Sequence, residues 1–250
     1  MTQLSERQLA IQERETAILD AARAVLLERG YFGLTMEVVA KACGCPKGTM
    51  YQRFGCKEDL IVALALRSIE KRLTMMKSAA RYDGLARERA LALNESVFLF
   101  TRLYPDDSRI MHAATGPVRE KATPLRIRQL MDVEHQQVAV LKGLLEAAVT
   151  EGSLVCHHED MITEMTFGMW ALVDGSFTLI ESDSPRAALG IQNPFTHTFR
   201  TVNVLADAYG WLPLFADLNW TETLAKVRQT VFPEEAQAVY GQGNWYGEPI

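Results

Sequence analysis

Apolar residues recur along this chain at intervals of three and four positions, which is the spacing of an amphipathic helix. The first such run predicts a helix over about residues 12–29, with the apolar positions Ile18, Leu19, Ala22, Val25 and Leu26. The same spacing predicts helices near residues 85–104, 107–115, 124–150, 158–181 and 194–212, and one or two short helices from Trp220 onward. Strand signals are scarce, so we expect an all-α fold.

Glycine and proline divide the residues that follow the first helix. Gly30 ends that helix, and Thr35 is a good N-cap for a short second helix that Gly44 closes. Pro46 opens a brief third helix, because proline at the first helical position loses no hydrogen bond. A long fourth helix begins at Lys57 and reaches about position 82. Two short helices around a glycine-centred turn are typical of a helix-turn-helix, whose second helix enters the major groove of DNA.

The chain is acidic as a whole, with a formal net charge of −5, but the charge is divided unevenly. Residues 1–82 hold 13 Lys and Arg against 9 Asp and Glu, a net of +4, whereas residues 83–250 hold 13 against 22, a net of −9. Phosphate attracts Lys and Arg. The asymmetry therefore indicates a nucleic-acid-facing end joined to an acidic remainder.

The segment GCPKGTMYQRFGCKEDL, residues 44–60, concentrates basic and hydrogen-bonding side chains on the third helix and its flanks. Some of them can reach base edges or phosphates, others offer donors to phosphate oxygens, and a glycine lets the helix approach the DNA backbone closely. The hydroxyl that caps the second helix can also reach phosphate. The candidate DNA-binding residues are Thr35, Lys47, Gly48, Thr49, Tyr51, Gln52, Arg53 and Lys57.

The stretch ILDAARAVLLERGYFGLTMEVVAKACGCPKGTMYQRFGCKEDLIVALA, residues 18–65, resembles the DNA-binding domain of the TetR family of transcriptional regulators without a gap. By this resemblance the eight candidates fall at positions that family members use on DNA, and Phe54 packs inward and fixes the recognition helix. The sequence departs from the family at Pro46, where serine is common, and at Cys56, where serine or asparagine often caps the fourth helix. Because cysteine is a poor cap, we expect the start of that helix to be less stable by about 1 kcal/mol.

The rest of the chain resembles the family in helical layout only. The resemblance implies a helix-turn-helix domain over residues 1–56, a helical ligand-binding and dimerisation domain over 57–219 and a C-terminal extension over 220–250. Family members form homodimers through their last two long helices, and here small residues on one stripe would let helices approach closely. The candidate dimer residues are Gly168, Ala171, Gly175, Phe195, Phe199, Val202 and Tyr209.

Proteins of this family also keep a ligand cavity between the dimer helices and the fourth helix. Aromatic and methionine side chains with a few polar groups suit a largely apolar organic ligand. The candidate lining residues are Asn94, Phe98, Met111, His112, His135, Met169, Trp170 and Asp174. We therefore expect a homodimeric repressor that a small, largely apolar molecule releases from a palindromic operator in double-stranded DNA.

The cysteines leave one alternative open. Oxidation of Cys43, Cys45 or Cys56 would perturb the recognition helix and make the chain a thiol-redox-responsive regulator, although Cys43 and Cys45 also suit small apolar core positions. Reactivity of this kind requires a lowered thiol pKa. Cys156 is remote from the other three, so no disulfide framework is expected.

Other classes of function have weaker signals. The residues CHHED, 156–160, could bind a metal, but adjacent histidines on a helix cannot both reach one ion without strain, so no metal site is expected. The sequence has no P-loop, GxGxxG, HExxH or GxSxG pattern, so we expect neither an enzyme nor a cofactor. A helical adaptor that does not bind DNA is the other rival. The polar N-terminus and the lack of a long apolar run predict a cytoplasmic protein without membrane contact.

Overall fold

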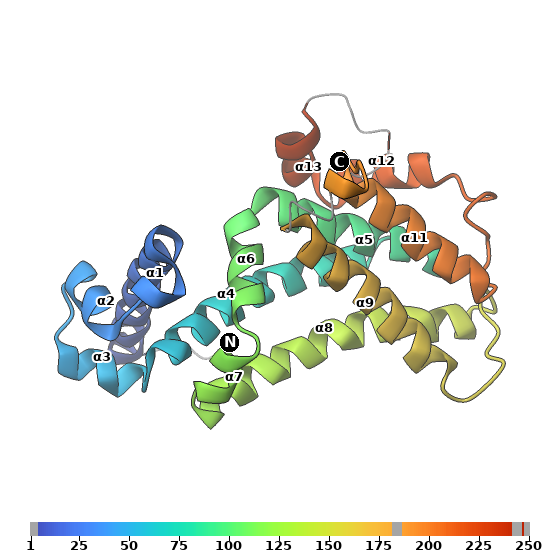
Figure 1. The fold of residues 1–250 in the computed structure, drawn as a ribbon. Coiled ribbons are helices and arrows are strands. Elements are labelled where there is room, and N and C mark those ends of the chain that lie inside the picture. The colour runs from blue at the N-terminus through green and yellow to red at the C-terminus, as the bar shows by residue number, and fades with distance from the viewer. Residues whose placement is uncertain (1–4, 182–186, 242–246, 248–250) are drawn as a thin grey trace. The chain divides into compact units, whose positions relative to one another are not determined.

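The computed structural model describes residues 5–181, 187–241 and 247 of the chain. Every regular element in these ranges is a helix (Figure 1), so the predicted all-α fold is confirmed. None of the helices in the described ranges has both the length and the apolar character needed to span a membrane.

The chain folds into two compact units, and each unit is built from two separate segments of the chain. The first unit consists of the chain up to Lys71 together with Tyr104–Glu134, and the second consists of Arg72–Leu103 together with the chain from His135. Two long helices contribute residues to both units. The units therefore cut across the domain boundaries predicted after residues 56 and 219.

The first unit contains the predicted helix-turn-helix and three later elements. Its helices are α1 (Glu6–Gly33), α2 (Met36–Ala42), α3 (Lys47–Arg53), the first part of α4 (Lys57–Ala79), α6 (Pro105–Ala113), α7 (Pro117–Lys121) and the first part of α8 (Pro124–Thr150). Hydrophobic periodicity did not predict α7, because five residues are too few to show a helical repeat.

Helix α1 begins earlier than the apolar pattern predicts because of its cap. The backbone N–H of Gln8 donates to Oγ of Ser5 at 3.3 Å, and the backbone N–H of Ser5 donates to Oε1 of Gln8 at 2.8 Å. This reciprocal capping box satisfies two N–H groups that a helix start otherwise leaves without partners. Three residues before the other end, Gly30 interrupts the helical backbone of α1 with a φ of +66°, a conformation that glycine adopts at little cost.

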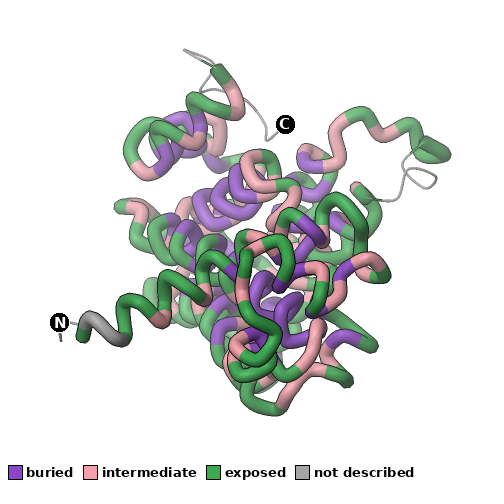
Figure 2. The backbone as a smooth tube through the Cα atoms, turned by 90° about the vertical axis from the view of Figure 1, so that its left-hand side faces the viewer, coloured by how far each residue is buried: buried purple, intermediate pink, exposed green. Residues whose placement is uncertain are grey.

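The core of the first unit is formed by apolar side chains that α1 to α4 turn inward. Buried positions recur along these helices between exposed ones, and Figure 2 shows the same alternation along the tube of the whole chain, as amphipathic helices require. Fully buried members of this core include Ala22, Leu34, Val39, Met50, Phe54 and Leu60.

The second unit is built from the remaining helices and the far ends of α4 and α8. Its own helices are α5 (Ala86–Leu103), α9 (Met161–Ile180), α11 (Pro194–Ala208), α12 (Trp220–Thr230) and α13 (Pro233–Tyr240). Helices α9 and α11 pack side by side (Figure 1). A Cβ atom added to Gly168 would lie 3.2 Å from Cδ2 of Leu205, so this glycine permits the close approach of the two helices within one chain.

A buried ion pair attaches the two C-terminal helices to α5. Nε and Nη2 of Arg228 on α12 donate to the carboxylate oxygens of Glu95 at 2.8 and 3.2 Å, and both side chains are at most 1% exposed. The hydroxyl of Tyr240 on α13 donates to the same carboxylate at 2.8 Å. Trp245 and Tyr246 of the aromatic tail lie outside the described residues.

Candidate nucleic-acid interface and ligand cavity

Helices α2 and α3 are held together by a capped helix start, a tight turn and two buried anchors. Oγ1 of Thr35 accepts a 3.2 Å hydrogen bond from the backbone N–H of Val38, which makes it the N-cap of α2. Gly44, with a φ of +66°, forms the turn before α3. Met50 and Phe54 are both 0% exposed, so the inward position that the resemblance implies for Phe54 is confirmed.

The opposite face of α3 is open to solvent. The side chains of Tyr51 and Gln52 are exposed there, and so is that of Lys47 at the helix start, whereas Thr49 and Arg53 are half-buried. No atom outside the helix lies within 4 Å of a Cβ built on Gly48, so this position forms a low point on an accessible surface. The sequence-predicted residues of α3 therefore lie together on and around one accessible, hydrogen-bonding face.

Glu37 on α2 lies beside two of these side chains. Its Oε1 atom is 3.7 Å from Nζ of Lys47 and accepts a 3.4 Å hydrogen bond from the hydroxyl of Tyr51. A hydrogen bond from its own backbone N–H, with help from the charge of Lys47, holds the pKa of Glu37 below its ordinary value. The charge of Glu37 in turn raises the pKa of Tyr51. The pair is therefore a protonated phenol and a charged carboxylate at neutral pH.

Lys57, at the start of α4, is held by α1. Its ammonium group donates to the backbone carbonyl of Tyr31 at 3.2 Å and lies 3.9 Å from the centroid of the Tyr31 ring. The hydroxyl of Tyr31 also donates a 2.7 Å hydrogen bond to Glu58. To bind a phosphate, Lys57 must therefore share its protons with this carbonyl or leave it.

The end of α3 is braced by residues that the sequence patterns did not single out. Asp59, which is 2% exposed, accepts hydrogen bonds from the backbone N–H of Gly55 at 3.0 Å and of Thr123 at 2.7 Å. The guanidinium of Arg126 lies 5.0 Å from the centroid of the Phe54 ring and donates to Glu15 at 3.0 Å. The start of α8 thus fixes the anchor of the recognition helix within the first unit.

The surroundings of Cys45 and Cys56 do not favour their thiolate forms. Burial is the main cause that raises the pKa of both Cys45 and Cys56. Backbone N–H groups at the start of α4 offset the shift of Cys56 only in part. A raised pKa leaves less thiolate, which is the reactive species, so these shifts do not favour the thiol-redox alternative.

The histidine-rich loop does not assemble a ligand set. Nε2 of His158 lies 3.5 Å from Oε2 of Glu164, and both side chains are about half exposed. Within the described residues no group of three histidine, cysteine, aspartate or glutamate side chains is placed to hold a metal ion.

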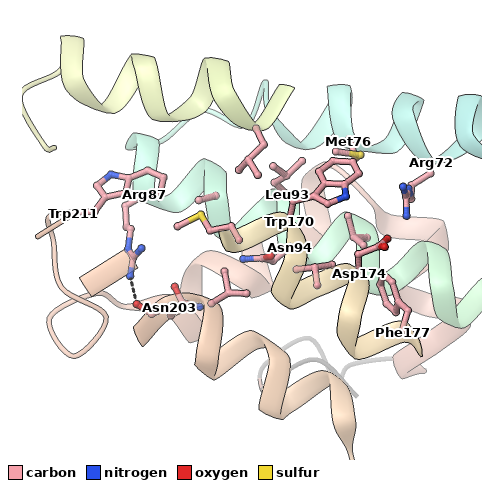
Figure 3. Close-up of a pocket in the computed structure, with 16 residues that line it drawn as sticks. Arg72, Met76, Arg87, Leu93, Asn94, Trp170, Asp174, Phe177, Asn203 and Trp211 are labelled. Carbon is pink, nitrogen blue, oxygen red and sulfur yellow. Dashed lines mark hydrogen bonds between the residues drawn. The ribbon is translucent and has the colours of Figure 1, made fainter. Parts of the chain in front are cut away.

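The second unit encloses a cavity between α4, α5, α8, α9 and α11 (Figure 3). The cavity has a volume of about 60 Å³. Most of the wall is apolar and includes Met76, Leu93, Val97, Leu141, Val173 and Phe177. Such a wall suits an apolar molecule.

Polar side chains stand at two separate places on this wall. Figure 3 shows Arg87 and Trp211 at one end, and Arg72 with Asp174 at the other. Nη2 of Arg72 donates to Oε1 of Gln137 at 2.9 Å. The two ends therefore present different polar groups to a molecule in the cavity.

Arg87 is a buried cation paired with the carboxylate of Asp207. It is 1% exposed, and its Nη2 atom donates to the carbonyl of Asn203 at 3.1 Å and to Oδ1 of Asp207 at 2.7 Å. Its guanidinium lies 5.2 Å from the centroid of the Trp211 ring. Burial lowers the pKa of Arg87 to about 10, because the charge of Asp207 compensates only part of the lost hydration.

The eight sequence-predicted lining residues do not all meet at this cavity. The wall includes Asn94, Met169, Trp170 and Asp174. Phe98 is buried instead against Phe195, with ring centroids 5.5 Å apart. Three others lie elsewhere, since Met111 and His112 belong to the first unit and His135 is exposed on α8.

Sequence patterns missed four polar members of the wall, namely Arg72, Arg87, Asn203 and Trp211. Arg87 carried a usable signal, because it stands four residues before Leu91 on the apolar face of a predicted helix. A charge at such a position is buried only with a partner or a function. Asn203 and Trp211 carried no such signal.

Exposed apolar side chains mark one surface of α9 and α11. Phe167 is 75% exposed, Val204 63% and Leu179 51%. Ala171 and Gly175 are also exposed and follow Phe167 at intervals of four residues, so they share its face of α9. We call these five residues the α9/α11 surface.

The candidate dimer residues fall only partly on this surface. Phe195, Phe199 and Val202 are at most 5% exposed, which corrects the sequence-based assignment: they form the core of this chain and are not available to a second copy. Gly168 lies where α9 packs against α11 of the same chain. Tyr209 is half-buried at the C-cap of α11.

Comparison with known proteins agrees with the helix-turn-helix geometry. Residues 18–64 match the family model described as bacterial regulatory proteins, tetR family. The HTH-type transcriptional regulator UidR of Escherichia coli (strain K12) is 34% identical over 74 residues, which are 30% of this chain and 38% of UidR. The match thus spans well under two thirds of that relative.

Solved structures extend the likeness to most of the fold. A tetR-family regulatory protein from Rhodococcus RHA1 superposes with a TM-score of 0.60 at 18% identity, covering 79% of this chain and 97% of that one. The regulator FadR from Bacillus subtilis, solved in complex with stearoyl-CoA, superposes with a TM-score of 0.57 at 15% identity, covering 78% and 97%. At these identities the likeness concerns the fold alone.

The capped α2, the glycine turn and the anchored α3 form a helix-turn-helix, and the family model covers this segment. On this basis residues 18–64 are a helix-turn-helix domain of the tetR family.

Proposed function

We propose that this chain is a one-component transcriptional regulator that binds a palindromic operator in double-stranded DNA as a homodimer. The observation that carries the proposal is the two-sided character of α3. Met50 and Phe54 anchor its inner side without exposure, while Lys47, Tyr51 and Gln52 are exposed outside. A helix held this rigidly, with donors and acceptors on its free face, fits the major groove.

Phosphate contacts come from the edges of the same surface. Thr35 and Arg53 flank the exposed face of α3, and the backbone approaches DNA closely at Gly48. Lys47 and Tyr51 exchange Glu37 for phosphate oxygens when DNA binds. The charge of Glu37 disfavours any anion that is not held by several donors at once, so it supports discrimination against loosely bound DNA.

A dimer is required because a palindrome presents the same half-site twice. The α9/α11 surface supports this role, since it places Phe167, Leu179 and Val204 in solvent on two neighbouring helices. Small residues on the same face of α9, Ala171 and Gly175, allow a second helix to approach closely.

The cavity of the second unit supports a small, largely apolar effector. Helix α4 contributes Arg72 and Met76 to its wall, and the same helix begins at Lys57, next to the recognition helix. A ligand that binds only one arrangement of α4 shifts the population toward that arrangement. We assign the role of repressor on this basis, with the DNA-free form favoured by the ligand. The related fold of FadR was solved with stearoyl-CoA, so this architecture accommodates a long apolar chain in at least one protein.

The proposal is tested by incubating the purified full chain with a fragmented genomic library of the source organism and sequencing the retained DNA. Enrichment of one or a few palindromic sites is expected, and Tyr51→Ala should abolish it. Tyr82→Ala, which changes a half-buried tyrosine of the second unit, is the matched control and should retain it. Retention that declines evenly with added salt, with no preferred site, would refute the regulator.

A further inference from the structure

The cavity contains two buried N–H groups that have no hydrogen-bond partner among the described residues. They are Nε of Arg87 and Nε1 of Trp211, on side chains that are 1% and 0% exposed. Both side chains belong to the cavity wall and lie next to each other at the same end (Figure 3). Both atoms are hydrogen-bond donors, and neither can accept a hydrogen bond from a ligand.

Two polar side chains beside these donors, Asn203 and Asp207, already make hydrogen bonds of their own. Nη2 of Arg87 is bound to Asn203 and Asp207. Asp207 also accepts the backbone N–H of Phe215 at 3.0 Å, and the amide nitrogen of Asn203 donates to the carbonyl of Phe199 at 2.9 Å. The neighbouring residues therefore leave this end of the cavity with a surplus of donors. A buried donor without a partner is costly, and a guest that brings an acceptor removes that cost.

We propose that the effector carries an oxygen acceptor, a carboxylate or a carbonyl, on an otherwise apolar body, and that Arg87 and Trp211 bind this oxygen. The inference rests on the proposed function, because it concerns the same cavity. The apolar wall around Met76, Leu93 and Val97 takes the rest of the molecule. An amine at this end would place a second cation beside the Arg87 guanidinium, so amines are excluded.

Electrostatics near Arg87 agree with this choice. Burial holds the pKa of Arg87 near 10, which still leaves it charged at neutral pH. An oxygen with negative or partial negative charge stabilises the guanidinium and also offers lone pairs to its free N–H.

The test uses straight-chain carboxylic acids of increasing length, with the primary amide and the primary amine of each length as matched probes. Their binding to the purified full chain is measured by isothermal titration calorimetry. At the best chain length, the acid or the amide should bind roughly tenfold or more tightly than the amine, as one charge-assisted hydrogen bond allows. The ratio of acid to amide distinguishes a carboxylate from a carbonyl, and either result supports the proposal.

Three variants separate recognition from folding. Trp211→Phe removes the indole N–H and keeps an aromatic ring, so the folded variant should bind the best probe roughly tenfold more weakly, and its melting temperature measures separately the cost of the smaller buried ring. Arg87→Lys removes Nε, keeps the charge beside Asp207, and should weaken the probe in the same way. Trp220→Phe is the matched control, because Trp220 lies outside the cavity wall and stacks on Phe215 at 5.6 Å; its affinity should equal that of the unaltered chain.

Three results would overturn the inference: an amine that binds as tightly as its acid and amide, a Trp211→Phe variant with unaltered affinity, or no acid or amide binding at any length. The second result is expected if water alone occupies the two donors. The genomic enrichment, run on the same preparation, keeps the two proposals apart. If the protein enriches palindromic sites but binds all probes alike, the regulator proposal stands and the inference about the effector is refuted. If it prefers the acid or amide but enriches no site, the inference about the effector stands and the regulator proposal is refuted.

Discussion

The carboxylate of Asp59 accepts a 2.7 Å hydrogen bond from the backbone N–H of Thr123, and so joins the beginnings of two long helices, α4 and α8. The same carboxylate accepts the backbone N–H of Gly55, directly after the anchor Phe54. One buried carboxylate therefore connects the end of the recognition helix α3 to the start of α8.

Asp59→Ala should lower the free energy of unfolding by about 1–3 kcal/mol, because it removes the acceptor of the part-buried backbone N–H groups of Gly55 and Thr123. Urea denaturation followed by circular dichroism measures this change. Asp20→Ala is the matched control: Asp20 is 59% exposed and pairs with Arg67 at the surface, so its loss should cost within about 0.5 kcal/mol. Equal losses for the two variants would argue against the bracing role.

Lys47→Ala should weaken binding to an enriched DNA fragment and reduce the slope of log affinity against log salt concentration by about 0.9, the contribution of one phosphate contact. Fluorescence anisotropy at several salt concentrations measures the slope. Lys142→Ala removes a lysine of the second unit that is 50% exposed, and the slope should stay unchanged. A Lys47→Ala variant with the parental slope would mean that Lys47 does not neutralise a phosphate.

The hydrogen bond from Tyr31 to Glu58 makes stability depend on acid. Burial alone would raise the pKa of Glu58, but this hydrogen bond and one from its own backbone N–H outweigh burial, so the pKa lies below the ordinary value of 4.5. The unfolded chain then binds the proton at higher pH than the folded chain does. The contribution to stability is therefore complete above about pH 4.5 and is lost as the pH falls through the lowered value.

Tyr31→Phe should consequently lower the free energy of unfolding by about 1.5–3 kcal/mol at neutral pH, as expected for a hydrogen bond to a charged group. The difference between the two proteins should shrink as the pH falls through and below the ordinary value of 4.5. Urea denaturation in a series of buffers provides the measurement. A difference that stays constant down to the most acid buffer would show that Tyr31 acts by packing alone.

Phe167→Glu should convert the proposed dimer into monomers, because it places a charge on the α9/α11 surface. Size-exclusion chromatography with light scattering measures the mass of the particle. Val155→Glu, at an apolar position of the second unit that is 61% exposed outside this surface, should remain dimeric. If Phe167→Glu keeps the dimer mass, the interface lies elsewhere.

The ion pair between Glu95 and Arg228 should show strong coupling. Arg228→Met leaves the buried carboxylate of Glu95 with the Tyr240 hydroxyl as its remaining partner among the described residues, and the free energy of unfolding should fall by about 3–5 kcal/mol. Adding Glu95→Leu should restore part of this loss, since no buried charge remains. Additive losses in the double variant would contradict coupling.

Local sequence signals were sufficient to predict the helix-turn-helix. Thr35 predicts the start of α2. Gly44 predicts the turn, because the turn has a positive φ and glycine adopts this conformation at low cost. The apolar repeat places the start of α1 too late, because the first turns of this helix carry few apolar residues. The capping pair Ser5 and Gln8 was nevertheless present as a signal.

An apolar stripe predicts that a helix face is covered, but not which surface covers it. This is why Phe195 and Phe199 were assigned to a dimer, whereas α11 turns them into its own core. The partners of the buried charges could not be predicted from the sequence either. Arg87 and Glu95 meet their partners Asp207 and Arg228 across 120 and 133 residues of chain, a distance that no periodicity bridges.

Hydroxyl-radical footprinting of the full chain on a genomic fragment that it enriches tests the central claim most directly. If two anchored copies of α3 read a palindrome, the protein should protect two equivalent zones, with centres about 34–36 Å or one helical turn apart. Lys47→Ala should weaken both zones together. A single protected zone, or uniform weak protection along the fragment, would contradict the account.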